Sequence, residues 1–313
     1  MSNSGWPHSE SPFHEGELSL QAQGGAQARI DTQGRRMIRP YLIAQHRQFF
    51  AELPYVILGS VDDAGAPWAS ILTGSPGVLS TPDEHTLRIV TSHLSAGAPL
   101  SVAVGDDVGV LGIELKTRRR NRINGTVSRM HSDGFEVHVQ QSFGNCPQYI
   151  QSRQVISSEP GDSVSAVVSE CSVFSEADKA LIASADTFFI ATAYQAKSAG
   201  RSSGVDVSHR GGHPGFVVIE GDRTLTIPDF SGNNHFNTLG NILLNPHAGL
   251  LFIDFDTGTL LHLTGTADVI VEGEGIAAYA GAQRLLRFRM ARGYRIESAL
   301  SLQWSLPEFS PFL

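Results

Sequence analysis

The residue types best suited to chemistry gather in a bend late in the chain. Residues 229–237 read Asp-Phe-Ser-Gly-Asn-Asn-His-Phe-Asn, and a short apolar run with helical spacing follows. Glycine lets backbone N–H groups approach an anion, hydroxyl and amide side chains donate hydrogen bonds, and a helix start offers its positive dipole end. The bend is therefore a candidate anion site. The alternative is that Asn233, Asn234 and Asn237 only cap the helix and complete a tight turn.

A second candidate is the arginine-rich stretch Lys-Thr-Arg-Arg-Arg-Asn-Arg at 116–122. Alternate residues of a strand share a face, so Arg118, Arg120 and Arg122 would present three guanidinium groups to one anion. The alternative is a solvated hairpin tip whose arginines pair with acidic neighbours.

The composition limits the classes of function. The chain has 313 residues, 41% of them hydrophobic, and a net charge of −8. The charge argues against a nucleic-acid partner, because phosphate backbones are held by clustered Lys and Arg. No apolar run approaches the ~20 residues of a membrane span, and the N-terminus does not resemble a secretory signal. We therefore expect a cytoplasmic protein without a membrane partner.

The sequence offers no sign of metal or nucleophilic chemistry. Cys146 and Cys171 are expected to be small buried apolar residues, and the histidines do not form a compact metal pattern. No nucleophile elbow, P-loop or dinucleotide fingerprint appears.

The elements that would position these residues are indicated by an internal repeat. Residues 109–126 and 249–266 align without a gap, with Gly109 on Gly249 and Gly125 on Gly265. Both segments predict a β-hairpin, and short strands are predicted upstream at 55–61 and 86–92, and at 187–193, 215–220 and 223–228.

Helices are expected to be few and peripheral. They are predicted at 41–53, at 175–185 with a Ser175–Asp178 capping box, and at 236–243, while 145–153 resembles a helix start capped by Asn145. We expect a mainly β fold of class α+β with an N-terminal arm (1–40), a degenerate first domain (41–160) and a second domain (167–313). The boundary is placed in the Ser-, Pro- and Gly-rich stretch 157–166.

The order of these segments resembles the pyridoxamine 5'-phosphate oxidase-like, FMN-binding split-barrel family. The resemblance rests on Val-Ser-His-Arg-Gly-Gly-His-Pro at 207–214, the bend at 229–237 and the hairpin ending in Leu-Thr-Gly-Thr at 263–266. It implies two tandem six-stranded Greek-key split barrels, with FMN bound between barrels. Members of the family are usually homodimers, so a homodimer is expected.

The resemblance also implies the cofactor site. Residues matching the family's phosphate-holding segments, or able to reach them, are Ser208, His209, Arg210, Asp229, Ser231, Gly232, Asn233, Asn237, Arg120 and Arg122. Family members usually carry Ser-Arg-Lys where this chain has Ser231-Gly232-Asn233, which removes two cations. Arg210 is then expected to supply the main charge. The arginine-containing C-terminal substrate motif is also absent, so pyridoxamine 5'-phosphate oxidation itself is not expected.

These observations predict an FMN-dependent oxidoreductase that acts on an unknown small molecule, with a nicotinamide nucleotide or another redox partner. No catalytic side chain is assigned, because the flavin would carry the electron chemistry. Two alternatives stay open. One is a protein that stores or senses a flavin or haem without turnover, and the other is a cofactor-free dimerisation scaffold.

Overall fold

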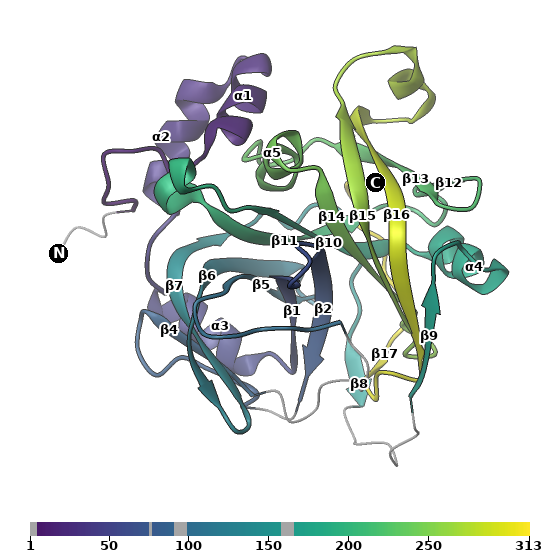
Figure 1. The fold of residues 1–313 in the computed structure, drawn as a ribbon, viewed down its shortest axis with the longest axis horizontal. Coiled ribbons are helices and arrows are strands. Elements are labelled where there is room, and N and C mark those ends of the chain that lie inside the picture. Colours follow the sequence, from purple (N-terminus) through teal and green to yellow (C-terminus); the bar gives the residue numbers. More distant parts are fainter. Residues whose placement is uncertain (1–4, 75–76, 91–98, 158–165) are drawn as a thin grey trace.

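The computed structural model describes residues 5–74, 77–90, 99–157 and 166–313 (Figure 1). We call residues 41–157 the first half and residues 166–313 the second half. The strands of the first half are β1 (Tyr55–Val61), β2 (Pro67–Thr73), β3 (Leu79–Ser80), β4 (Thr86–Val90), β5 (Asp107–Glu114), β6 (Arg119–His131), β7 (Gly134–Gly144) and β8 (Val155–Ser157). Those of the second half are β9 (Val167–Cys171), β10 (Thr187–Tyr194), β11 (Gly204–Gly211), β12 (Val218–Glu220), β13 (Thr224–Phe230), β14 (His247–Ile253), β15 (Leu260–Ile270), β16 (Ala282–Glu297) and β17 (Gln303–Trp304). The α-helices are α1 (Glu15–Gln23), α2 (Gln27–Met37), α3 (Ala44–Glu52), α4 (Glu176–Ser184) and α5 (Asn237–Leu244).

The two halves contain antiparallel sheets with the same strand order. The first sheet runs β2-β1-β5-β6-β7-β4-β3, and the second runs β11-β10-β14-β15-β16-β13-β12, with β9 beside β16. The prediction of a mainly β fold with peripheral helices is confirmed. The expected strands are present, although the run at 215–220 is a strand only from Val218 and residues 91–92 lie outside the described residues.

Both predicted hairpins are present and share a structural detail. A β-bulge lies immediately before Gly125 in β6 and immediately before Gly265 in β15. A Cβ atom on Gly125 would lie 2.2 Å from the carbonyl oxygen of His138, and one on Gly265 would lie 2.0 Å from that of Arg289. Glycine is required at both positions for the same steric reason, which accounts for the match between the two sequence segments.

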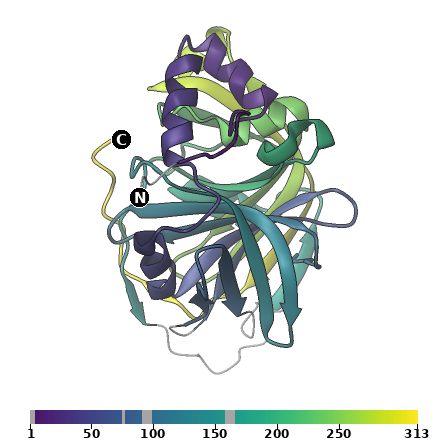
Figure 2. The ribbon, with the colours of Figure 1, turned by 90° about the vertical axis from the view of Figure 1, so that its left-hand side faces the viewer.

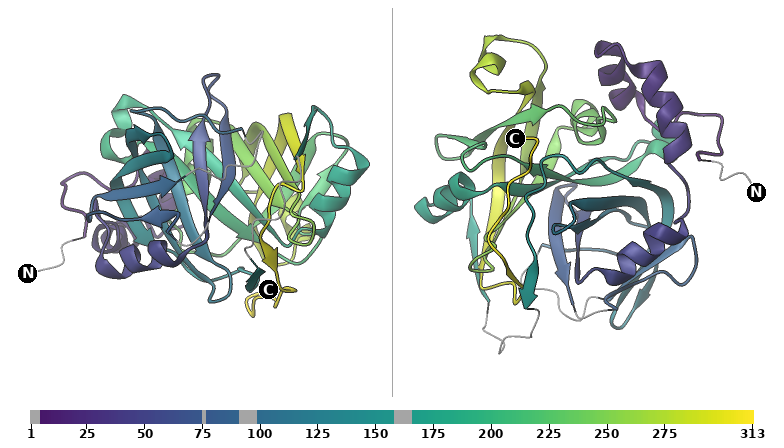
Figure 3. Two further views of the ribbon diagram at one scale, coloured as in Figure 1. Left: turned by 90° about the horizontal axis from the view of Figure 1, so that it is seen from below. Right: turned by 180° about the vertical axis from the view of Figure 1, so that it is seen from behind.

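Each sheet surrounds a hydrophobic core of its own, and a third core lies between the halves, which stand side by side in Figure 3. This third core is formed from both halves, and its members include Tyr55, Ile57, Ile71, Leu111, Phe189, Val207, Leu251 and Leu260. The two sheets therefore pair within one chain.

Two glycines allow this close pairing. A Cβ atom on Gly109 in β5 would lie 2.8 Å from the carbonyl oxygen of Val205 in β11. One on Gly249 in β14 would lie 2.3 Å from the carbonyl oxygen of Pro67 in β2. Each sheet thus packs against the edge strand of the other half. A residue larger than glycine at either position would push the two sheets apart.

The segment predicted as an N-terminal arm contains two helices among the residues that the structure describes. Residues 15–37 form α1 and α2, and α1 packs against α5 (Figure 2). The helical signal is weak in the sequence because α1 buries Gly16, Glu17 and Gln21 beside Leu20, and the apolar periodicity is lost. A capping box between His14 and Glu17 fixes the start of the helix.

The other helix predictions are confirmed with one exception. Helix α3 lies within 41–53, α5 lies at the predicted position, and the Ser175–Asp178 capping box opens α4. Residues 145–153 do not form a helix, because Tyr149 adopts a left-handed backbone with φ of 64°. Ile150 is fully buried there as expected, whereas Tyr149 is only half-buried.

The predicted boundary at 157–166 lies almost entirely outside the described residues, so the domain limits stay a prediction. Strand β17 pairs with β8, so the last part of the chain lies against the segment that leaves the first half. Among the described residues, no helix has both the length and the apolar character needed to cross a bilayer.

Candidate functional site

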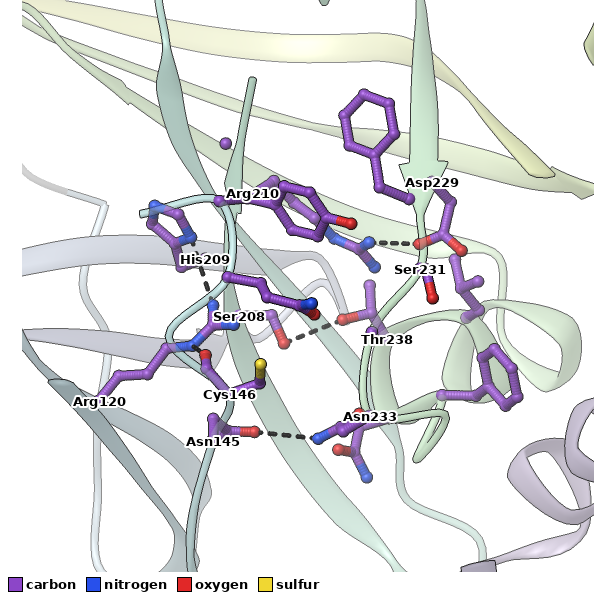
Figure 4. Close-up of a pocket in the computed structure, with 18 of the residues that line it drawn as sticks. Arg120, Asn145, Cys146, Ser208, His209, Arg210, Asp229, Ser231, Asn233 and Thr238 are labelled. Carbon is purple, nitrogen blue, oxygen red and sulfur yellow. Dashed lines mark hydrogen bonds and ion pairs between the residues drawn. The ribbon is translucent and has the colours of Figure 1, made fainter. Parts of the chain in front are cut away.

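A cavity of about 130 Å³ lies where the two halves meet at the start of α5 (Figure 4). It is lined by β6 and the loop after β7 from the first half, and by β11, the end of β13 and the bend before α5 from the second half. All ten residues singled out in the sequence line this one cavity: Arg120, Arg122, Ser208, His209, Arg210, Asp229, Ser231, Gly232, Asn233 and Asn237. The fold thus brings together residues more than 100 positions apart, although no ligand contact tests their role.

The arginines of the first half separate into different environments. Arg120 and Arg122 share a face of β6 and line the cavity, as the strand alternation predicts. Arg118 does not share that face, because it lies in the hairpin turn with φ of 56° and donates to the carbonyl of Ile150. Arg119 lies 4.4 Å over the ring of Phe49. The expectation of three guanidinium groups on one face is therefore wrong, and two remain.

Arg122 is neutralised inside the protein. Its guanidinium is 2.9 Å from the carboxylate of Asp206 and also donates to Asn237 Oδ1 at 2.9 Å and to the hydroxyl of Ser208. The side chains of Arg122 and Asp206 are only 5% and 8% exposed. Breaking a buried pair of this kind leaves an uncompensated charge, so Arg122 serves to hold the two halves in place.

Arg120 has different surroundings. It donates through Nε to the carbonyl of Cys146 at 2.8 Å and through Nη1 to Nδ1 of His209 at 3.3 Å. Within the described part of the chain it makes no ion pair. Burial, with Arg122 nearby, lowers the pKa of Arg120 to about 10. Arg120 is consequently a half-buried cation with no ion-pair partner among the described residues.

His209 is kept neutral beside Arg120. Burial and then the charge of Arg120 lower the pKa of His209 well below its usual value. A guanidinium can only donate, so Nδ1 of His209 must accept, and the neutral ring carries its hydrogen on Nε2. His209 therefore adds no charge to the cavity and serves as an acceptor that orients Arg120.

Arg210, which the sequence predicts as the main charge of the site, is paired. Its guanidinium bonds the carboxylate of Asp229, and Arg284 lies 3.3 Å from the other oxygen of that carboxylate. Asp229 is therefore engaged in a structural three-residue cluster at the cavity wall. The cluster still carries one net positive charge, so the wall remains attractive to an anion.

The bend before α5 leaves the helix start open. Phe236, at the N-cap position, adopts a left-handed conformation with φ of 62° and provides no side-chain cap. Asn233 accepts from the N–H of His235, and Asn237 bonds Glu17 and Arg122, so neither caps the helix. The N–H groups of the first turn have no acceptor within the helix. The capping interpretation therefore holds for the turn at Asn233 but not for the helix itself.

Some residues of the site were missed in the sequence. The loop after β7 contributes Asn145, Cys146 and Tyr149, and Asn233 donates to Asn145 Oδ1 at 3.4 Å across the cavity. Cys146 is a free, half-buried thiol rather than a buried apolar residue. The sequence predicts a helix start capped by Asn145 at this loop, and so assigns the loop a structural role instead of a place in the site.

No protein-family model and no curated protein matches this sequence. Solved structures do match it, each over most of its own length. One is a protein from Clostridium acetobutylicum related to general stress protein 26, of the pyridoxinephosphate oxidase family, at 14% identity over 41% of this chain and 91% of its own, with a TM-score of 0.27. A FAD-binding protein from Mesorhizobium loti matches at 11% identity over 42% and 98%, with a TM-score of 0.29. The heme storage protein HutZ from Vibrio cholerae matches at 14% over 43% and 95%, with a TM-score of 0.24.

These structures match the chain at low TM-scores and low identities. Their identities are too low to carry a ligand or an activity from those proteins to this chain. The site must therefore be interpreted from its own residues.

Proposed function

We propose that this chain is a tandem-duplicated split-barrel flavoprotein of the pyridoxamine 5'-phosphate oxidase-like family, and that its cavity holds the phosphate of FMN. Arg120 is the observation that carries the proposal, because a half-buried guanidinium at the cavity, with no carboxylate partner among the described residues, is stabilised by an external anion. The open first turn of α5 faces the same cavity.

The residues present fit a phosphate group. Arg120 would supply charge, while the hydroxyl of Ser231 and the buried amide nitrogen of Asn145, which has no partner among the described residues, would supply hydrogen-bond donors. Arg120 would thereby replace the two cations that are missing from positions 232 and 233. Arg210 and Asp229 would form the wall of the site.

The size of the cavity limits how FMN would bind. Its volume of about 130 Å³ is below the roughly 300 to 1,000 Å³ of ordinary small-molecule pockets. The phosphate end would therefore be enclosed, and the flavin ring would lie toward the opening. When bound, FMN would supply the electron or hydride transfer of a flavin-dependent oxidoreductase, while the chain binds and orients it.

The visible spectrum of the purified protein, alone and after incubation with FMN, tests this proposal. A flavin spectrum that remains after gel filtration is expected, and its bleaching by a nicotinamide nucleotide without oxygen would indicate an oxidoreductase. A flavin that stays oxidised would favour a carrier, and a haem spectrum the haem-binding alternative. A chain that retains neither cofactor would contradict the proposal and favour a scaffold.

The core between the halves and the residues that line the cavity all belong to one chain. The cavity therefore does not require a second copy of the chain. A homodimer remains a prediction. Light scattering is expected to give twice the mass of the chain, and a monomeric mass would contradict it.

A further inference from the structure

Two aromatic side chains stand at the cavity without belonging to a core. Tyr149 and Phe230 both line the cavity, and their ring centroids are 5.3 Å apart with planes tilted by 36°. Neither is a member of the four hydrophobic cores formed by the described residues, and both are half-buried. Aromatic area that is left half-exposed beside a polar cavity is suited to contact with a ligand.

The backbone around Tyr149 is held in an unfavourable conformation. A φ of 64° is rare for a bulky residue and costs on the order of 1–2 kcal/mol. The next residue, Ile150, is fully buried, and its carbonyl accepts from Arg118 at 3.0 Å, while the carbonyl of Tyr149 accepts from Gln151 at 3.4 Å. These contacts fix the loop and direct the Tyr149 ring toward Phe230. Strain of this kind, maintained by its surroundings, is common where a residue is placed for binding.

Phe230 is fixed from the other side of the cavity. It is the last residue of β13 and follows Asp229, which Arg210 and Arg284 anchor. One ring therefore comes from the first half and one from the second. The two rings therefore lie at the same junction between the halves as the candidate phosphate site.

We infer that Tyr149 and Phe230 form the surface on which the planar ring of the bound ligand stacks. This inference rests on the proposed FMN site, because a cavity of about 130 Å³ is too small for a tricyclic ring, which must then lie beside the aromatic residues of the lining. The two ends of the site would thus select a ligand that carries both a phosphate and an aromatic ring. A phosphate without a ring would use only the Arg120 end.

The test compares FMN with inorganic phosphate as ligands of Tyr149→Asn and Phe230→Leu. Asparagine tolerates the left-handed conformation at position 149, so the first variant removes the ring without adding strain. Aromatic stacking of this type supports an expected loss of roughly fivefold to a hundredfold in FMN affinity. Phosphate affinity is expected to stay unchanged, and the fluorescence of bound FMN, quenched by aromatic contact in the natural chain, is expected to rise. The matched control is Tyr279→Leu, since Tyr279 is half-exposed and does not line the cavity.

Each other outcome has a definite meaning. If Tyr149→Asn binds FMN as tightly and quenches it as strongly as the natural chain, the inference is wrong while the FMN proposal stands. Equal losses of FMN and phosphate affinity, or a large fall in melting temperature without ligand, would show that Tyr149 only shapes the loop. A natural chain that binds neither FMN nor phosphate would overturn the proposed function itself.

Discussion

The two halves present related faces to each other, and these faces carry different side chains at equivalent positions. Ser208 in β11 pairs with Ile190, and Ser70 in β2 pairs with Leu58, so the two serines occupy equivalent positions. By the same register, Arg120 and Arg122 of β6 correspond to Leu260 and His262 of β15, and Asp206 of β11 corresponds to Trp68 of β2.

The face that contains Trp68, Leu260 and His262 is filled mainly by apolar packing. Trp68 is 1% exposed, and Leu260 belongs to the core between the halves. His262 is fully buried and bonds the carbonyl of Ala69 at 2.9 Å, whereas the corresponding Arg122 reaches across to Asp206 and Ser208. The same strand arrangement therefore lines a cavity on one face and is packed on the other, and the two faces differ at three of the equivalent positions named.

The largest expected effect comes from giving the face with Arg120 the side chain that the packed face carries at the equivalent position, Leu260. Arg120→Leu should lower FMN affinity about tenfold to somewhat over a hundredfold, because a hydrogen bond to a charged group contributes roughly 1.5 to 3 kcal/mol. Its free energy of unfolding without ligand should stay level or rise, since a half-buried charge with no ion-pair partner among the described residues is removed. Titration calorimetry and urea unfolding measure the two quantities.

Leu260→Ala is the matched variant at the equivalent position of the packed face. It should lower the free energy of unfolding by about 2 to 5 kcal/mol through the cavity it leaves. FMN affinity should not change. If both variants shift affinity alike, or both shift stability alike, the contrast between the two faces is wrong.

The next effect tests whether the halves are structurally equivalent. Gly125→Ala and Gly265→Ala each place a Cβ atom against a backbone carbonyl, at 2.2 and 2.0 Å. Each should lower stability by about 1–3 kcal/mol, in the range for overpacking. Chemical denaturation of both variants measures this, and a cost at only one site would show that the two bulges are not equivalent.

A smaller effect should appear in the pH dependence. Burial lowers the pKa of His262 to about 4, so the unfolded chain binds the additional proton between about pH 6.5 and 4. The stability contributed by the neutral ring is fully present above pH 6.5 and is lost as the pH falls toward 4. His262→Gln should reduce the slope of stability against pH by up to about 1.4 kcal/mol per unit in that window. Chemical denaturation of the variant and the natural chain at several pH values from 4 to 7 measures this slope. Equal slopes for the two proteins would contradict this assignment.

The smallest effect is expected at Arg210. Because Asp229 keeps Arg284 as a partner, Arg210→Ala should cost about 1 kcal/mol or less of stability and weaken FMN less than Arg120→Leu does. Affinities measured side by side decide this point. If Arg210→Ala loses more FMN affinity than Arg120→Leu does, Arg210 supplies the main charge of the site.

Much of this arrangement was predictable because it depends on local patterns. The repeat aligns Gly109 with Gly249 because at each position the backbone of the other half lies too close for any side chain. The bend at 229–237 and the arginines at 120 and 122 were identified by residue type, and all line the cavity.

What the sequence could not predict depends on long-range pairing. The partners of Arg122 and Arg210 are set by which strands meet, so the free charge was assigned to Arg210 instead of Arg120. Tyr149 was missed because its position depends on a left-handed backbone that no local rule favours for tyrosine. Helix α1 was missed because its buried face is polar and small.

The stoichiometry of FMN binding tests the central claim most directly. Titration of the purified chain with FMN, followed by calorimetry and flavin fluorescence, should reach saturation at one FMN per chain, because only the face with Arg120 can accept the phosphate. Saturation at two FMN per chain would show that the packed face also binds, and no binding at all would show that the cavity at the start of α5 is not a flavin site.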